Sequence, residues 1–188
     1  MNAKTKILLT LVALALSMAA LWYGAQYLRT GQFWAYIKPP SFRESPPDPV
    51  FFIADLHSYA TVKATSGQLE QKGYGLTPKE KSNYGEFKGR KFNVESFEIP
   101  KFRLADKDFK LSLVFFNDRL AQVYVCSEQG VPLLLQIVNT ELGLNLKMQS
   151  SITNGHVRIQ YIGSDGDCVL MDELRLEQEY QLWNALTS

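Results

Sequence analysis

Residues 109–126 read FKLSLVFFNDRLAQVYVC, and no other stretch of the chain indicates its fold as strongly. Apolar residues alternate with polar ones through the first half, and a second apolar run follows Asn117-Asp118. A period of two is the pattern of a strand with one buried face, and Asn-Asp is typical of a tight turn. The stretch therefore predicts a β-hairpin.

The register of this hairpin follows if Phe116 pairs with Arg119 across the two-residue turn. An antiparallel ladder without irregularity then sets Phe109 opposite Cys126, so the cysteine would point into the core. The other pairs expected from this register are Leu111 with Tyr124 and Leu113 with Gln122.

Other parts of the chain show weaker strand patterns. Residues 92–99 alternate with one slip of phase, which predicts a strand with a bulge before Pro100. Residues 157–161 and 169–171 predict a second hairpin, joined through GSDGD, whose Asp and Gly residues favour a turn. Residues 77–91 are polar and rich in Lys and Gly, without clear periodicity, and predict a loop.

Two helices are expected before and after the first hairpin. The earlier one would begin after Ser58 or Thr61, either of which suits an N-cap, and end at Gly73, which suits a left-handed C-terminal residue. The later one would have Pro132 in its first turn and stop at Gly143.

A last helix completes the expected fold. Asp172 could cap it, and its core-facing stripe would consist of Leu176, Tyr180 and Trp183. The elements together predict an α+β fold, a two-layer sandwich with helices on one face of an antiparallel sheet. The segments LEQKGYGL and NTELGLNL each place a Gly after a helix and before strands, which suits a degenerate αββ duplication and equally suits any two-layer sandwich.

Residues 7–28 form an uncharged run, ILLTLVALALSMAALWYGAQYL, that would be about 33 Å long as an α-helix. This predicts one transmembrane helix within residues 1–28. The alternative is a cleaved signal peptide, for which Ser17 and Ala19 would suit the cleavage site, but the apolar run continues past it. The aromatic residues expected at the membrane interface are Trp22, Tyr23, Tyr27, Phe33, Trp34 and Tyr36.

Residues 29–50 are aromatic and rich in proline, and the part that reads PPSFRESPPDP predicts an extended spacer before a domain at 51–188. Basic residues on the two sides of the apolar run nearly cancel, so they barely decide its orientation. A short tail before the run is the usual signal-anchor arrangement. We therefore expect a bacterial inner-membrane protein with the domain on the periplasmic side.

Cys126 and Cys168 are the two cysteines of the chain, and both fall at expected strand ends. An even count suits a disulfide in an oxidising compartment. Two separate buried thiols are the alternative.

Residues 44–188 contain 15 basic and 19 acidic residues, a formal charge of −4, which argues against nucleic acid as a partner. Within them, residues 79–110 are net basic. The simpler interpretation is a solvated face, and the functional one is a contact patch for anionic lipid or an acidic protein, formed by Lys88, Arg90 and Lys91.

No catalytic, metal or cofactor motif is present. His57 and His156 are far from each other and from the cysteines in sequence, whereas zinc ligands usually come in close pairs. The acidic pairs Asp106 with Asp108 and Asp165 with Asp167 are better explained as turn residues than as cation ligands. We therefore expect no metal and no cofactor.

Three functional hypotheses remain. The first is a non-enzymatic, membrane-anchored protein whose domain binds another envelope protein, as an accessory subunit, assembly factor or scaffold. The second is a module that binds a small molecule, lipid or polymer in a groove between sheet and helices, lined by Phe97, Phe102, Phe115 and Tyr124. The third is a hydrolase with an unrecognised site, for example His57 paired with Asp55 or Cys126.

Overall fold

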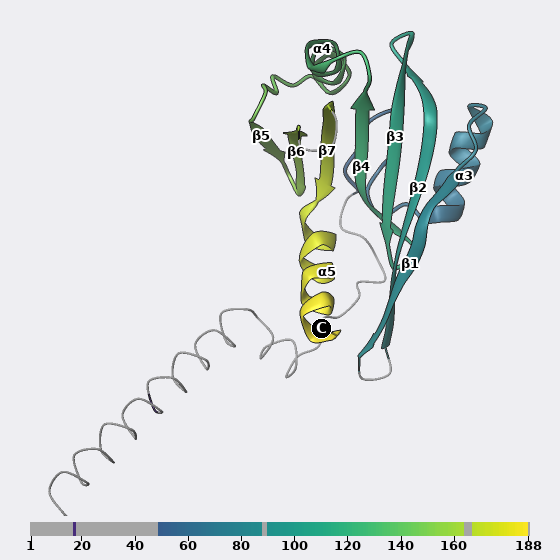
Figure 1. Ribbon diagram of the computed structural model, residues 1–188, viewed down its shortest axis with the longest axis vertical. Helices are drawn as coiled ribbons and strands as arrows, with labels where there is room; N and C mark the ends of the chain where they lie inside the picture. The colour runs from purple at the N-terminus through teal and green to yellow at the C-terminus, as the bar shows by residue number, and fades with distance from the viewer. Residues whose placement is uncertain (1–16, 18–48, 88–89, 164–166, 188) are drawn as a thin grey trace, which may run out of the picture. The chain divides into compact units, whose positions relative to one another are not determined.

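The computed structural model describes residues 17, 49–87, 90–163 and 167–187. Residues 43–181 form one compact unit, and the fold is that of this unit. It is an α+β fold with a seven-stranded antiparallel sheet in the order β1-β2-β3-β4-β7-β6-β5 (Figure 1). The elements are α3 (Val62–Gln71), β1 (Thr77–Phe87), β2 (Arg90–Leu104), β3 (Lys107–Phe116), β4 (Arg119–Ser127), α4 (Val131–Leu142), β5 (Ser151–Asn154), β6 (Val157–Ile162), β7 (Asp167–Glu173) and α5 (Leu174–Thr187).

The hairpin of β3 and β4 was predicted correctly, including the pair of Phe116 with Arg119, but the register beyond that pair was wrong. An irregularity at Val114 and Phe115 shifts the ladder by one residue. Lys110, not Phe109, therefore lies opposite Cys126. Because successive side chains point to opposite faces of a sheet, the shift turns Cys126 away from the core.

The core lies on one face of the sheet, which we call the inner face, and α3 and α4 cover it. Leu69 of α3 and Leu134 of α4 belong to the same buried cluster as the strand residues. The strand residues at its centre are Ile99, Phe102, Phe109, Leu111, Leu113, Phe115, Leu120, Val123, Val125, Val157, Ile159, Val169 and Met171.

The caps of these two helices agree with the sequence. Thr61 is the N-cap of α3, and its hydroxyl accepts a hydrogen bond from the amide of Ala64 at 3.1 Å. Gly73 follows this helix with a φ of +84°. The helix α4 ends at Gly143, whose φ of +62° is the left-handed conformation that glycine adopts without strain.

The last helix departs from the prediction in two ways. It begins at Leu174 directly after β7, so Asp172 is a buried strand residue and not its cap. Tyr180 contacts Phe116, at 5.8 Å between ring centroids, and Phe116 does not belong to the core cluster of the inner face. The helices therefore do not all pack on one face, because α5 meets the outer face of the sheet.

Residues 77–91 were predicted to be a loop, but they contain the whole of β1 and the start of β2. Two register shifts, between Pro78 and Glu80 and between Glu80 and Asn83, interrupt the pairing of β1 with β2. Since β1 is also an edge strand, no regular alternation marks it in the sequence. The strand β2 continues through Pro100, with its irregularity between Ile99 and Phe102.

The sheet consists of two sequential halves. The first half is α3 followed by β1 to β4, and the second is α4 followed by β5 to β7. They meet where β4 pairs with β7. This arrangement is compatible with a duplication, which stays a prediction.

Several predictions concern residues that the structure does not describe: the transmembrane helix at 7–28, the interfacial aromatic residues and the proline-rich spacer before residue 49. Within the described part of the chain, no helix is both long and apolar enough to cross a membrane.

Candidate functional site

The outer face of the sheet carries the side chains that alternate with the core residues. Ser96, Ser112 and Tyr124 lie on it, on β2, β3 and β4. The strands are long, and α5 meets only part of this face. Two adjoining cavities lie on it, and Val114 lines both of them.

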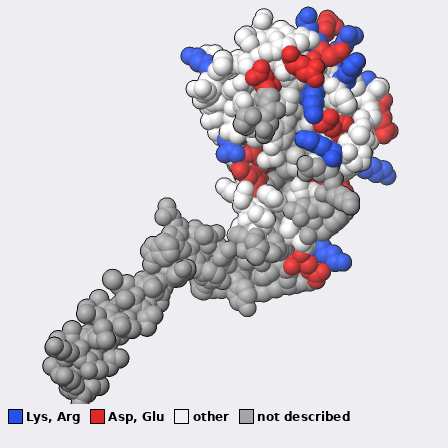
Figure 2. Space-filling view, viewed as in Figure 1, with Lys and Arg blue, Asp and Glu red and all other residues white. Residues whose placement is uncertain are grey.

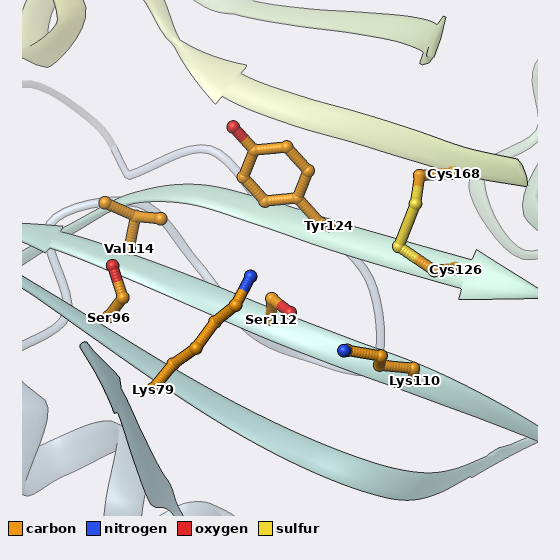
Figure 3. A pocket seen from close by; sticks show the side chains of 8 residues that line it. All are labelled: Lys79, Ser96, Lys110, Ser112, Val114, Tyr124, Cys126 and Cys168. Carbon is orange, nitrogen blue, oxygen red and sulfur yellow. A yellow bond between two sulfur atoms is a disulfide. The ribbon is translucent and has the colours of Figure 1, made fainter. Parts of the chain in front are cut away.

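The first cavity, which we call the lysine cavity, has a volume of about 340 Å³. Strands β1 to β4 and β7 each contribute to it, so distant parts of the sequence meet here. Figure 3 shows the side chains of Lys79 and Lys110 extending into it near Ser112. Its lining residues are Lys79, Ser96, Lys110, Ser112, Val114, Tyr124, Cys126 and Cys168.

The lysine cavity is positively charged. None of the residues that line it is acidic. The ammonium group of Lys110 is 2.8 Å from the Glu98 carboxylate, which partly neutralises it, whereas Lys79 has no ion pair with any residue that the structure describes. With the hydroxyl groups of Ser96 and Ser112 beside them, the two lysines offer hydrogen-bond donors suited to an anion.

A chain of polar side chains borders this cavity. The hydroxyl of Tyr124 donates to Gln122 at 3.2 Å, and the amide of Gln122 donates to Asp172 at 3.2 Å. Asp172 also accepts a hydrogen bond from Arg158, which is bonded in turn to Glu177 at 3.0 Å. The charged residues on this side are therefore already paired with one another.

The ionisation of these groups follows from their burial. Burial raises the pKa of the Asp172 carboxyl, and the hydrogen bond from Gln122 and the charge of Arg158 oppose that shift. Burial likewise raises the pKa of Tyr124, and the carboxylates of Asp172 and Glu177 add to the effect. Tyr124 therefore keeps its proton and acts as a hydrogen-bond donor.

The second cavity, which we call the apolar cavity, has a volume of about 180 Å³ and lies between the outer face and α5. Apolar side chains supply most of its wall, and Glu177 stands at it as the one acidic lining residue. Its lining residues are Val94, Val114, Phe116, Ala121, Gln122, Leu176, Glu177, Tyr180 and Gln181. The two cavities adjoin at Val114, and we call them together the groove, with lysines at one end and apolar side chains at the other.

Cys126 and Cys168 form a disulfide at the wall of the lysine cavity (Figure 3). They lie directly opposite each other on β4 and β7, so the bond links the two halves of the sheet. A disulfide-bonded sulfur is not a free thiolate, which excludes Cys126 as a nucleophile in this state and removes its proposed pairing with His57.

The histidines are held in structural contacts. The Nδ1 atom of His57 is 3.1 Å from the carbonyl oxygen of Ser58, and the ring of His156 contacts the guanidinium of Arg175. Among the described residues, no group of three His, Cys, Asp or Glu side chains is placed to hold a metal ion. Asp106 lies in the turn between β2 and β3 with a positive φ, as predicted, whereas Asp108 and Asp167 were wrongly predicted as turn residues and belong to β3 and β7. Asp165 lies outside the described residues.

The sequence predicted two contact surfaces, a groove between sheet and helices and a basic patch. The residues predicted to line a groove between sheet and helices do not meet, because Phe102 and Phe115 fill the core while Tyr124 lies on the opposite face. Of the basic patch, Lys91 is exposed, Arg90 begins β2, and Lys88 lies outside the described residues. Lys91 does not line the lysine cavity.

Sequence reasoning missed the site because its residues are the polar half of an alternating pattern. Lys110 and Ser112 look like ordinary solvent-facing residues between the core residues of β3. Figure 2 shows basic and acidic side chains interspersed on the visible face, without a large region of one sign. No family model, curated protein or solved structure shows a significant match to this chain.

Proposed function

We propose that this protein is a membrane-anchored envelope protein, not an enzyme, whose domain binds another protein through the outer face of its sheet. The N-terminal apolar run would hold it in the bacterial inner membrane, with the domain on the periplasmic side. The observation that carries the proposal is the groove formed by the lysine cavity and the apolar cavity. Its mixed lining, with apolar side chains beside polar donors, is typical of protein contact surfaces.

The disulfide supports the proposed compartment. Disulfides form and persist in oxidising compartments such as the periplasm. The Cys126–Cys168 bond also closes the lysine cavity on one side, which keeps β4 and β7 in a fixed relation beneath a bound partner. A groove on strands is more rigid than one on loops, and a rigid site loses less entropy when a partner binds.

Site-specific photocrosslinking of the full-length chain in its native cells tests the proposal. A photoreactive amino acid would replace Gln181, an exposed residue at the apolar cavity, and in a matched control would replace Gln136, an exposed residue on α4. We expect one discrete protein adduct from position 181 and none of that mass from position 136. Mass spectrometry of the adduct identifies its chemical nature.

Two outcomes would contradict the proposal. The first is the absence of any adduct from position 181 in cells that contain the folded protein. The second is the same series of adducts from both positions, which would indicate random collisions and not a bound partner.

A small-molecule, lipid or polymer ligand is the second candidate, and the volume of the lysine cavity favours it. About 340 Å³ lies at the lower end of the range of small-ligand sites. Native mass spectrometry of the full-length chain from mild detergent would reveal such a ligand as added mass. A chain at its sequence mass in several detergents would argue against this candidate.

A further inference from the structure

The groove has two chemically different ends, and this difference restricts what can occupy it. Lys79 and Lys110 stand at one end without an acidic lining residue, while Glu177 and apolar side chains stand at the other. A carboxylate would be attracted to the lysine end. At the other end it would meet a largely apolar wall, where burying a charge is unfavourable, beside Glu177, whose partner Arg158 is shared with Asp172.

Lys79 is the group best placed to attract such a carboxylate. It extends from the edge strand β1 into the cavity, and it has no ion pair with any described residue. Lys110 is positioned by Glu98 and contributes donors more than net charge. The site is therefore a local positive centre on a domain whose residues 44–188 have a formal charge of −4.

The strand geometry gives the spacing of the two ends. Ser112 lies in the lysine cavity and Phe116 in the apolar cavity, four residues further along β3. Four residues of strand span roughly 13 Å. An extended segment laid along β3 presents side chains to the same face at intervals of two residues, so positions four apart reach both cavities.

We infer that the groove binds an extended segment of the partner protein that carries an acidic side chain and, four residues away, a bulky apolar one. The acidic side chain enters the lysine cavity and the apolar one enters the apolar cavity. This inference rests on the proposed function, since it names the chemistry of the segment that the groove holds.

The test uses the crosslinked adduct from position 181 as its readout. Lys79→Gln removes the charge but keeps a similar length, and Lys79→Arg keeps the charge. Lys101→Gln is the matched control, because Lys101 is exposed on β2 outside both cavities. We expect Lys79→Gln to lower the adduct yield roughly tenfold, which is the effect of losing one hydrogen bond to a charged group. Lys79→Arg and Lys101→Gln should change the yield little.

Three further measurements make the outcome decisive. Lys110→Gln changes the other lysine of the cavity and should also lower the adduct yield. With two independent variants, a folding defect in one does not obscure the result. The urea midpoint of each variant should equal that of the wild type. Sequencing of the crosslinked peptide should place the apolar and acidic residues four positions apart.

The possible results separate this inference from the proposed function. An undiminished adduct yield in both Lys79→Gln and Lys110→Gln would overturn the inference and leave the proposed protein binding intact. An adduct whose peptide lacks an acidic residue would do the same. An adduct with lipid or glycan, or no adduct from the wild type, would overturn both.

Discussion

Removal of the disulfide is the perturbation whose magnitude the structure fixes best. Cys126 and Cys168 are 42 residues apart in sequence and directly opposite on β4 and β7. Cross-linking reduces the entropy of the unfolded chain, and the loop-closure relation for 42 residues gives about 4 kcal/mol at 25 °C. The bond joins the two halves of the sheet, so its loss affects the whole fold and not one hairpin.

Urea unfolding of the full-length chain in detergent, followed by far-ultraviolet circular dichroism, measures this effect. With a denaturant slope of about 2 kcal/mol per molar urea, the midpoint should fall by roughly 2 M. Wild type under dithiothreitol and the variant Cys126→Ala/Cys168→Ala should have the same midpoint, because both lack the cross-link. The first keeps both sulfur atoms and the second removes them, so the comparison separates the cross-link from side-chain packing. The slope should be somewhat steeper in the reduced protein, because its unfolded chain is less compact and exposes more surface.

An unchanged midpoint in reduced wild type, with both thiols titratable, would refute the reasoning. It would mean that the unfolded chain already holds β4 and β7 close together, so that the cross-link removes little entropy. A fall in the double variant alone would instead assign the effect to lost packing at the cavity wall.

The remaining predictions concern single residues. Burial raises the pKa of Glu173 above its ordinary 4.5, because it disfavours the charged carboxylate. The stabilisation that comes from the protonated carboxyl is therefore fully present below pH 4.5 and is lost as the pH rises through the pKa of the folded protein. Glu173→Gln should therefore gain stability relative to wild type over that pH range in urea titrations, and parallel pH profiles would contradict this. Gly85→Ala should destabilise the β1–β2 hairpin, because an added Cβ would lie 1.9 Å from the ring of Phe92. Hydrogen exchange of that hairpin should report it, and Phe92→Leu in the same chain should restore part of the loss; full protection in the Ala variant would count against the clash. Thr61→Ala should cost about 1 kcal/mol by loss of the α3 cap, and Thr61→Ser should cost little. Equal urea midpoints for the Ala and Ser variants would show that the cap contributes nothing.

The sequence predicted the elements whose local signals are strong. The alternation from Phe109 to Phe115, Pro132 at the start of α4 and Gly143 at its end each act over a few residues. The α+β class and the antiparallel sheet followed from the order of these elements. Local signals of this kind depend on the period of the chain and on backbone preferences, which neighbouring residues decide.

The sequence did not predict the edge strand β1 or the site. Bulges and exposure removed the alternation from β1, and the polar residues of β3 looked like solvated positions. Lys79 and Ser112 are brought into one cavity only by the pairing of β1, β2 and β3. Nothing in either local segment contains that information.

Cys126 shows the difference between what the local sequence determines and what the pairing of strands determines. By itself the sequence determined that 109–126 is a hairpin closed at Asn117-Asp118, because turn and alternation are local. The tertiary structure alone decided that Cys126 lies on the outer face. A one-residue shift at Val114 and Phe115 reverses the direction of every β4 side chain beyond it, and such an irregularity belongs to the pairing of two strands, not to the alternation within one.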